Sequence, residues 1–142
     1  MWVTGRSLVL AVVGGAVLWN GCRRAETRPE HIQSFAQIPA PRPELYMHVQ
    51  DYAQWKNPFL TVLPDGIRIQ CLPLTFEKKV QVGALRETLL SLPVPAWPYG
   101  SIVAVQAGSG PQNDITPALI EKNRVQVESI LKASGVTIDY WP

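Results

Sequence analysis

The stretch that decides the fold is Phe59–Cys71, with the sequence FLTVLPDGIRIQC. Two apolar runs flank Pro64-Asp65-Gly66, and a proline followed closely by a glycine between such runs is a strong signal for a hairpin turn. In the second run the isoleucines alternate with Arg68 and Gln70. One face of that strand should therefore be covered and the other solvated. The stretch predicts a β-hairpin in a sheet with a packed face.

The chain after the hairpin alternates between helical and strand patterns. Thr75–Gln81 fits a further short strand, and Ser101–Ala107 is the most hydrophobic strand, which places it inside the sheet. Between them, apolar residues recur at helical spacing until Pro93 and Pro95 break the pattern. These residues are Val82, Leu85, Leu89 and Leu92.

The clearest helical pattern begins at Thr116, which is expected to cap a helix with Pro117 in its first position. Its apolar stripe is Ile120, Val127, Ile130 and Leu131, Gly135 ends the helix, and Val136–Tyr140 returns as a last strand. The order is strand, strand, helix, strand, helix, strand. It predicts an α+β fold in which two helices cover one face of a small mixed sheet.

Residues 1–21 carry the features of a signal peptide or membrane anchor. Ser7–Gly21 is apolar except for Asn20 and follows Arg6. Cleavage before Cys22 would give a lipoprotein lipidated at that cysteine. An uncleaved segment would be an anchor, although its 15 residues fall short of the roughly 20 that span a bilayer. Simple cleavage would release the domain. We expect a domain tethered to membrane lipid, facing the periplasm or the outside of a bacterial envelope.

Residues 22–43 are rich in proline and predict a flexible, extended spacer. Residues 44–142 are then left as a single α+β domain. A short helix is expected near Pro43, with Leu45, Val49 and Tyr52 on one stripe.

Composition argues against several classes of function. The net charge of +2 is concentrated before Pro43, because residues 43–142 hold eight Lys/Arg against nine Asp/Glu. The folded part therefore lacks the basic surface that nucleic acid needs. His31 and His48 lack metal-ligand spacing, and no cofactor motif is present. The Gly108-Ser109-Gly110 loop lacks the Gly-Lys-Ser/Thr ending of a phosphate loop. Cys71 ends a strand-like run and is expected to be buried and inert.

Aromatic residues are the candidates for partner binding. Trp97 and Tyr99 lie in the proline-rich run Pro93–Gly100, and they form either an exposed ledge or a cover for the core. Tyr140 and Trp141, near the last strand, present the same alternatives. A homodimer through this strand is a further alternative, since terminal strands often lie at sheet edges.

The layout resembles the periplasmic domain of the ExbD/TolR family of biopolymer-transport accessory proteins. The resemblance covers about Phe59 to Tyr140: a hairpin on Pro64-Asp65-Gly66, a helix with Leu85 and Leu89, the Ile102–Ala107 strand, and a helix ending near Gly135. It implies an α+β fold and the binding of protein partners. Ser7–Gly21 lacks the membrane aspartate of that family, so energy transduction is not implied.

Two functions follow from the sequence. The favoured one is a non-enzymatic, membrane-tethered envelope protein with a protein-binding or accessory domain. The alternative is a small envelope hydrolase centred on His48 and Asp51. It requires these side chains to meet a serine or threonine within hydrogen-bond reach.

Overall fold

The hairpin forms as the sequence predicts, in a computed structural model that describes residues 32–142. It joins β1 (Phe59–Leu63) to β2 (Gly66–Cys71). Gly66 begins β2 at a φ of 148°, and a Cβ there would lie 2.5 Å from the carbonyl oxygen of Val80. Only glycine fits where the hairpin meets the next strand, β3 (Phe76–Val80).

The five strands of the sheet follow the order β3-β2-β1-β4-β5. β1 pairs antiparallel with β2 and parallel with β4 (Ile102–Ala107), and β5 (Thr137–Trp141) runs parallel to β4. The sheet is therefore mixed, as predicted. The short strand expected at Thr75–Gln81 is β3, and the hydrophobic β4 lies inside the sheet.

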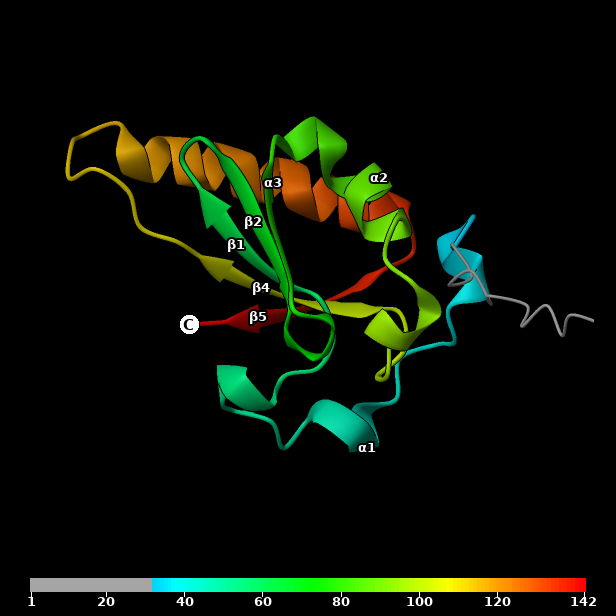
Figure 1. Cartoon of the computed structure of the whole chain (residues 1–142). Helices are drawn as coiled ribbons and strands as arrows, with labels where there is room; N and C mark the ends of the chain where they lie inside the picture. Colours follow the sequence, from blue (N-terminus) through cyan, green and yellow to red (C-terminus); the bar gives the residue numbers. More distant parts are fainter. Residues whose placement is uncertain (1–31) are drawn as a thin grey trace, which may run out of the picture.

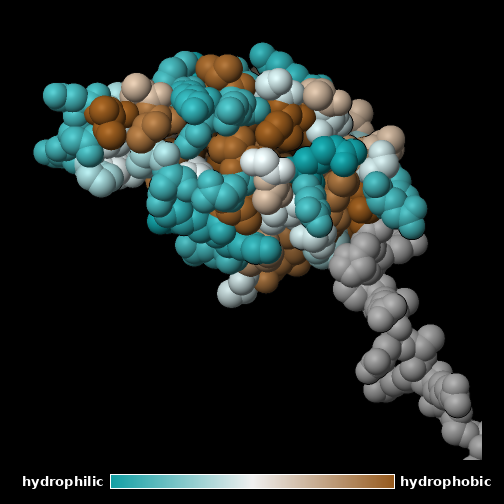
Figure 2. Space-filling view, turned by 90° about the horizontal axis from the view of Figure 1, so that it is seen from above, coloured by the Kyte–Doolittle hydropathy of each residue, from teal (hydrophilic) through white to brown (hydrophobic). Residues whose placement is uncertain are grey.

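Two helices cover one face of the sheet (Figure 1). They are α2 (Leu85–Leu90) and α3 (Thr116–Ala133). Their buried residues include Leu85, Leu89 and Leu131, which join one core cluster with the side chains of β1 and β2. The predicted α+β class with two helices on one face is confirmed. The solvent side of this layer mixes hydrophilic and hydrophobic residues (Figure 2).

The start of α3 differs from the prediction in one detail. Thr116 is the first helical residue and Pro117 the second, Ile115 is at the N-cap position, and the side chain that accepts from the first helical N–H is that of Asn113. The Asn113 side-chain oxygen accepts from the backbone N–H of Thr116 at 2.9 Å, and the Thr116 hydroxyl donates to the Pro111 carbonyl at 2.6 Å. The capping side chain thus comes from three residues earlier than expected.

The opposite face of the sheet is covered by residues 43–57 (Figure 1). α1 (Pro43–Tyr46) begins at Pro43 as predicted but ends before Val49, so the expected stripe of Leu45, Val49 and Tyr52 does not form. The reason is a second short turn, η2 (Tyr52–Gln54), capped by the Asp51 side chain, which accepts from Ala53 N–H at 2.9 Å. The other short turns are η1 (Phe35–Gln37), η3 (Leu72–Leu74), η4 (Val82–Ala84) and η5 (Val94–Ala96).

Residues 32–42 form a strap over the domain, which corrects the expectation of a flexible spacer for this part of the chain. Ile32, Phe35 and Ile38 are all buried in the helix-side core. The Ser101 N–H donates to the Pro39 carbonyl at 2.9 Å, and Arg42 N–H donates to the Tyr99 carbonyl at 3.0 Å. These contacts fix an apolar, proline-rich segment that would be extended and mobile in isolation.

The expected signal segment 1–21, the spacer residues 22–31, Cys22 and His31 lie outside the described residues. Within residues 32–142, no helix is both long and apolar enough to cross a bilayer.

Candidate functional site

The outer edge of β5 is the candidate functional site. β5 pairs with β4 on one side, and no strand of residues 32–142 lies on the other. The N–H of Thr137 donates inward, to the Ser101 carbonyl at 2.9 Å. Because the backbone groups of successive strand residues point to alternate sides, the N–H groups of Ile138 and Tyr140 face outward. The β5 edge can therefore accept another extended segment.

Two aromatic residues that the sequence singled out lie on this strand, and the structure separates them. Tyr140 is 54% exposed. Its pKa is raised by burial of part of the phenol and by the nearby Glu128 carboxylate of α3. Trp141 points to the other face, where its ring packs edge-on against Trp55 and Phe59, with centroids 5.7 and 5.4 Å apart. Tyr140 is available for contact, while Trp141 anchors the strand.

A groove of about 540 Å³ runs beside the β5 edge. Met47, 75% exposed, lies on its wall together with exposed Gln50. We call it the edge groove; its lining is Tyr46, Met47, Val49, Gln50, Asp139, Tyr140, Trp141 and Pro142. An exposed methionine beside an unpaired strand edge is the kind of adaptable apolar surface that binding sites use.

The edge groove has an acidic character. Asp139 is its one charged lining residue among the described part of the chain, and its carboxylate accepts from the Trp141 indole N–H at 3.1 Å. Burial raises the pKa of the Tyr46 phenol, and the carboxylates of Asp139 and Glu44 raise it further. The edge groove therefore carries one carboxylate, that of Asp139, and Glu44 lies near enough to Tyr46 to act on its pKa.

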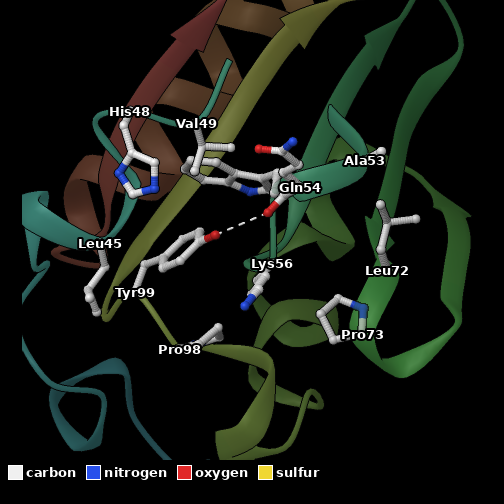
Figure 3. Close-up of a pocket in the computed structure, with 11 residues that line it drawn as sticks. Leu45, His48, Val49, Ala53, Gln54, Lys56, Leu72, Pro73, Pro98 and Tyr99 are labelled. Atoms are coloured by element: carbon white, nitrogen blue, oxygen red, sulfur yellow. Dashed lines mark hydrogen bonds between the residues drawn. The ribbon is translucent and has the colours of Figure 1, made fainter. Parts of the chain in front are cut away.

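A second groove, of about 710 Å³, is shown in Figure 3, and Val49 lines both this groove and the edge groove. His48 and Lys56 lie on either side of the Tyr99 ring in this view. We call it the basic groove; its lining is Leu45, His48, Val49, Ala53, Gln54, Trp55, Lys56, Leu72, Pro73, Pro98 and Tyr99.

Buried hydrogen bonds fix the floor of the basic groove. The side-chain amide of Asn57, 1% exposed, donates to the carbonyls of Gly100 and Ile102 at 2.8 Å each. Its oxygen accepts from the Tyr99 N–H at 2.9 Å, and the Tyr99 hydroxyl donates to the Gln54 carbonyl at 3.2 Å. Asn57 thus joins the segment before β1 to the segment before β4.

An exposed ledge made of Trp97 and Tyr99 is contradicted by the structure. Trp97 is 4% exposed and packs edge-on against Phe35 of the strap, with ring centroids 6.0 Å apart. Tyr99 is 5% exposed and packs against Trp55 at 5.2 Å. Both side chains cover the core, because burying a large ring is worth more to a small domain than displaying it.

The structure does not bring His48 and Asp51 into a hydrolytic arrangement. Across residues 32–142, no hydrogen bond joins His48 to Asp51 or to a serine or threonine. Asp51 instead caps η2. The hydrolase alternative therefore has no geometric support in the described part of the molecule.

The structure also locates the cysteine and the glycine-rich loop that the sequence analysis considered. Cys71 is fully buried, as expected, and burial raises the pKa of its thiol. Gly108 and Gly110 lie in the connection from β4 to α3, packed against Thr61 and Pro64 side chains. Residues 32–142 contain no group of three or more His, Cys, Asp and Glu side chains placed to hold a metal ion.

Sequence reasoning missed Met47, Lys56 and Asn57. A methionine outside any apolar stripe was the available signal for Met47. Asn57 precedes Pro58, and a residue before proline avoids the helical conformation. This local pattern indicates the end of a helix and gives no sign of a buried amide. Its buried hydrogen bonds join residues more than 40 positions apart, so no local pattern encodes them.

Comparison of the chain with models of protein families, with curated proteins and with solved structures finds no match. The function must therefore be inferred from the geometry of the β5 edge and its grooves.

Proposed function

We propose that this protein is a non-enzymatic, membrane-tethered accessory protein of the cell envelope that binds an extended segment of a partner protein along β5. The observation that carries the proposal is the unpaired β5 edge with the edge groove beside it. Addition of a strand to such an edge supplies main-chain hydrogen bonds, and an adjacent groove supplies side-chain selection.

The two edges of the sheet differ in a way that favours β5. β3, at the opposite edge, carries Glu77, Lys78 and Lys79 in succession, and Lys79 forms an ion pair with Asp65. Charged side chains, lysines above all, protect an edge strand from pairing with other chains. Asp139 is the only charged residue of β5, so this edge lacks the protection that lysines give to β3.

Charge disfavours a second copy of this chain as the occupant. An antiparallel pair of β5 strands centred on Asp139 would place two aspartates directly opposite each other, which is destabilising. A segment with apolar side chains for the Met47 wall and a basic one for Asp139 fits better. The homodimer alternative predicts instead that a second copy of this chain occupies the β5 edge.

The tether rests on the apolar run Ser7–Gly21 and on Cys22. The intact mass of the membrane-extracted chain tests it. A mass for residues 22–142 plus acyl groups would identify a lipoprotein, and a full-length mass in the membrane would identify an anchor. The layout resemblance to the ExbD/TolR family supports the accessory role, and it carries no activity over to this chain.

A Tyr140→Pro substitution tests the binding mode. The N–H of Tyr140 faces outward, so proline removes a donor from the edge and leaves the inward bonds to β4 in place. A photo-crosslinking amino acid at position 47, on the exposed wall of the edge groove, in the full chain in its native membrane, should give one discrete protein adduct. We expect Tyr140→Pro to abolish that adduct.

Tyr140→Ala is the matched control, because it removes the exposed ring and keeps the backbone donor. It should retain most of the crosslink. A crosslinker at Lys78, on β3, should give none. Equal adducts with Tyr140→Pro and the unsubstituted chain, or a crosslink to a second copy of the chain, would contradict the proposal.

A further inference from the structure

We propose that the basic groove binds an acidic, apolar peptide segment of a partner protein, at a site separate from the β5 edge. The two grooves share only Val49 in their linings and differ in charge. This proposal stands on the geometry of the basic groove alone and does not depend on strand addition at β5.

The charges of the groove determine what it can hold. Two of its lining residues in the described chain, His48 and Lys56, are basic and none is acidic. Neither takes part in an ion pair within residues 32–142. A carboxylate entering the groove would meet two donors, one a fixed positive charge, with no acidic side chain competing for them.

The walls of the groove are apolar and stiff. Leu45 and Leu72, 36% and 42% exposed, lie at opposite ends of it (Figure 3). Pro73 and Pro98 form further wall, and proline restricts backbone motion. An aliphatic side chain placed against either leucine would remove apolar surface of both partners from water.

The floor is ordered before any ligand arrives. Tyr99 is held through its hydroxyl by Gln54 and through its N–H by Asn57. Binding therefore costs little ordering of the groove itself, which favours a short segment with few contacts.

A peptide segment fits better than an anionic membrane surface. Glu44 and Asp51 lie on the same stretch of chain as His48, and both are exposed. A flat anionic bilayer would meet these carboxylates together with the basic groups. A narrow extended peptide can reach His48 and Lys56 without covering the acidic side chains.

Two matched peptides test the inference. We would titrate the isotope-labelled full chain, in nonionic detergent micelles, with acetyl-Glu-Leu-Glu-Leu-Glu-amide and with its glutamine analogue, and follow the amide resonances by NMR. The acidic peptide should shift the amide resonances of residues 45–56 and of Tyr99 and bind at least 5-fold more tightly than the analogue. Raising the salt concentration should reduce that difference.

Variants separate this site from a general charge effect. The double substitution His48→Gln and Lys56→Gln should weaken binding of the acidic peptide at least 5-fold, while Lys78→Gln on β3 should leave it unchanged. Tyr140→Pro should not affect it, so failure here is distinct from failure of the β5 proposal.

Three results would overturn the inference. They are equal binding of the two peptides, unchanged affinity in the double variant, and shifts that map to β5 instead of the basic groove. Larger shifts of the same resonances on adding phosphatidylglycerol to the micelles would assign the groove to a lipid headgroup and would also overturn it.

Discussion

The side-chain amide of Asn57 lies 2.8 Å from the carbonyl oxygen of Gly100, and this hydrogen bond links two segments that are 43 residues apart in the sequence. The nitrogen of the same side chain also donates to the Ile102 carbonyl, and its oxygen accepts from the Tyr99 N–H. It is buried, so water cannot replace it. The contact between residues 57 and 100 is therefore part of what holds the aromatic face of the domain together.

Asn57→Ala should destabilise the fold by at least about 2 kcal/mol, because each buried polar group left unsatisfied costs about 1–3 kcal/mol. The substitution strands the Ile102 carbonyl and the Tyr99 N–H, while the Gly100 carbonyl keeps the Ile102 N–H as a donor. Urea denaturation measures the change. Asn113→Ala is the control: it removes an exposed cap of α3 and should cost about 1 kcal/mol. Similar losses for both variants would contradict the role assigned to Asn57.

Gly100→Ala should destabilise the domain by about 2 kcal/mol or more. Gly100 has a φ of 88°, and a Cβ there would lie 2.4 Å from the Ala40 carbonyl oxygen in the strap. The control is Gly83→Ala, because nothing lies within 4 Å of a Cβ at Gly83. Thermal unfolding measures the stability of both variants, and Gly83→Ala should be neutral or slightly stabilising. A stable Gly100→Ala protein would show that the strap can shift without cost.

Two tyrosine-to-phenylalanine substitutions should have opposite effects. The Tyr52 hydroxyl is buried and finds no hydrogen-bond partner among the described residues, so Tyr52→Phe should leave stability unchanged or raise it by up to about 1 kcal/mol. The Tyr99 hydroxyl donates to Gln54, so Tyr99→Phe should lower stability by about 1 kcal/mol. Chemical denaturation of both variants checks this, and a loss in Tyr52→Phe equal to that in Tyr99→Phe would refute it.

The Cys71 thiol should resist labelling in the folded protein. It is fully buried, and burial raises its pKa, so less thiolate is present near pH 8 than in a free cysteine. In the full chain with Cys22→Ser, an aromatic disulfide reagent should react roughly 100-fold more slowly before than after addition of urea. Equal rates would mean that the strand end around Cys71 opens readily.

The same shift fixes how stability depends on pH. The thiol of the unfolded chain loses its proton at a lower pH than the buried Cys71 thiol does. The stabilisation gained by burying the protonated thiol is therefore fully present below the ordinary thiol pKa. Raising the pH from the ordinary thiol pKa through the raised pKa of Cys71 should destabilise the fold. Cys71→Ala should flatten this part of the stability curve, and an unchanged curve would show that the thiol does not cause it.

The periodic elements of the fold could be predicted from sequence because their signals are local. The hairpin at Pro64-Asp65 and the leucine spacing of α2 needed no knowledge of distant residues. The strap could not be predicted, because the burial of Ile32 and Ile38 depends on contacts with residues far away in the sequence, among them the hydrogen bond between Pro39 and Ser101.

The candidate site was predicted only in part. Tyr140 and Trp141 were singled out by residue type, and the structure places one outward and the other in the aromatic cluster. Their role in binding stays a prediction. The groove wall at Met47 belongs to a distant stretch of chain and meets β5 only after folding. Trp97 and Tyr99 show the converse: residue type alone does not tell a contact surface from a core.

The strap would have a mechanical consequence under the proposed function, in which a tether precedes the strap and a partner binds β5. A pull applied to the chain before Ile32 reaches the sheet first at the backbone bonds of Pro39 with Ser101 and of Arg42 with Tyr99. Ser101 also accepts from Thr137, the first residue of β5. Tension between such a tether and a partner on β5 would therefore be transmitted through the backbone of Ser101.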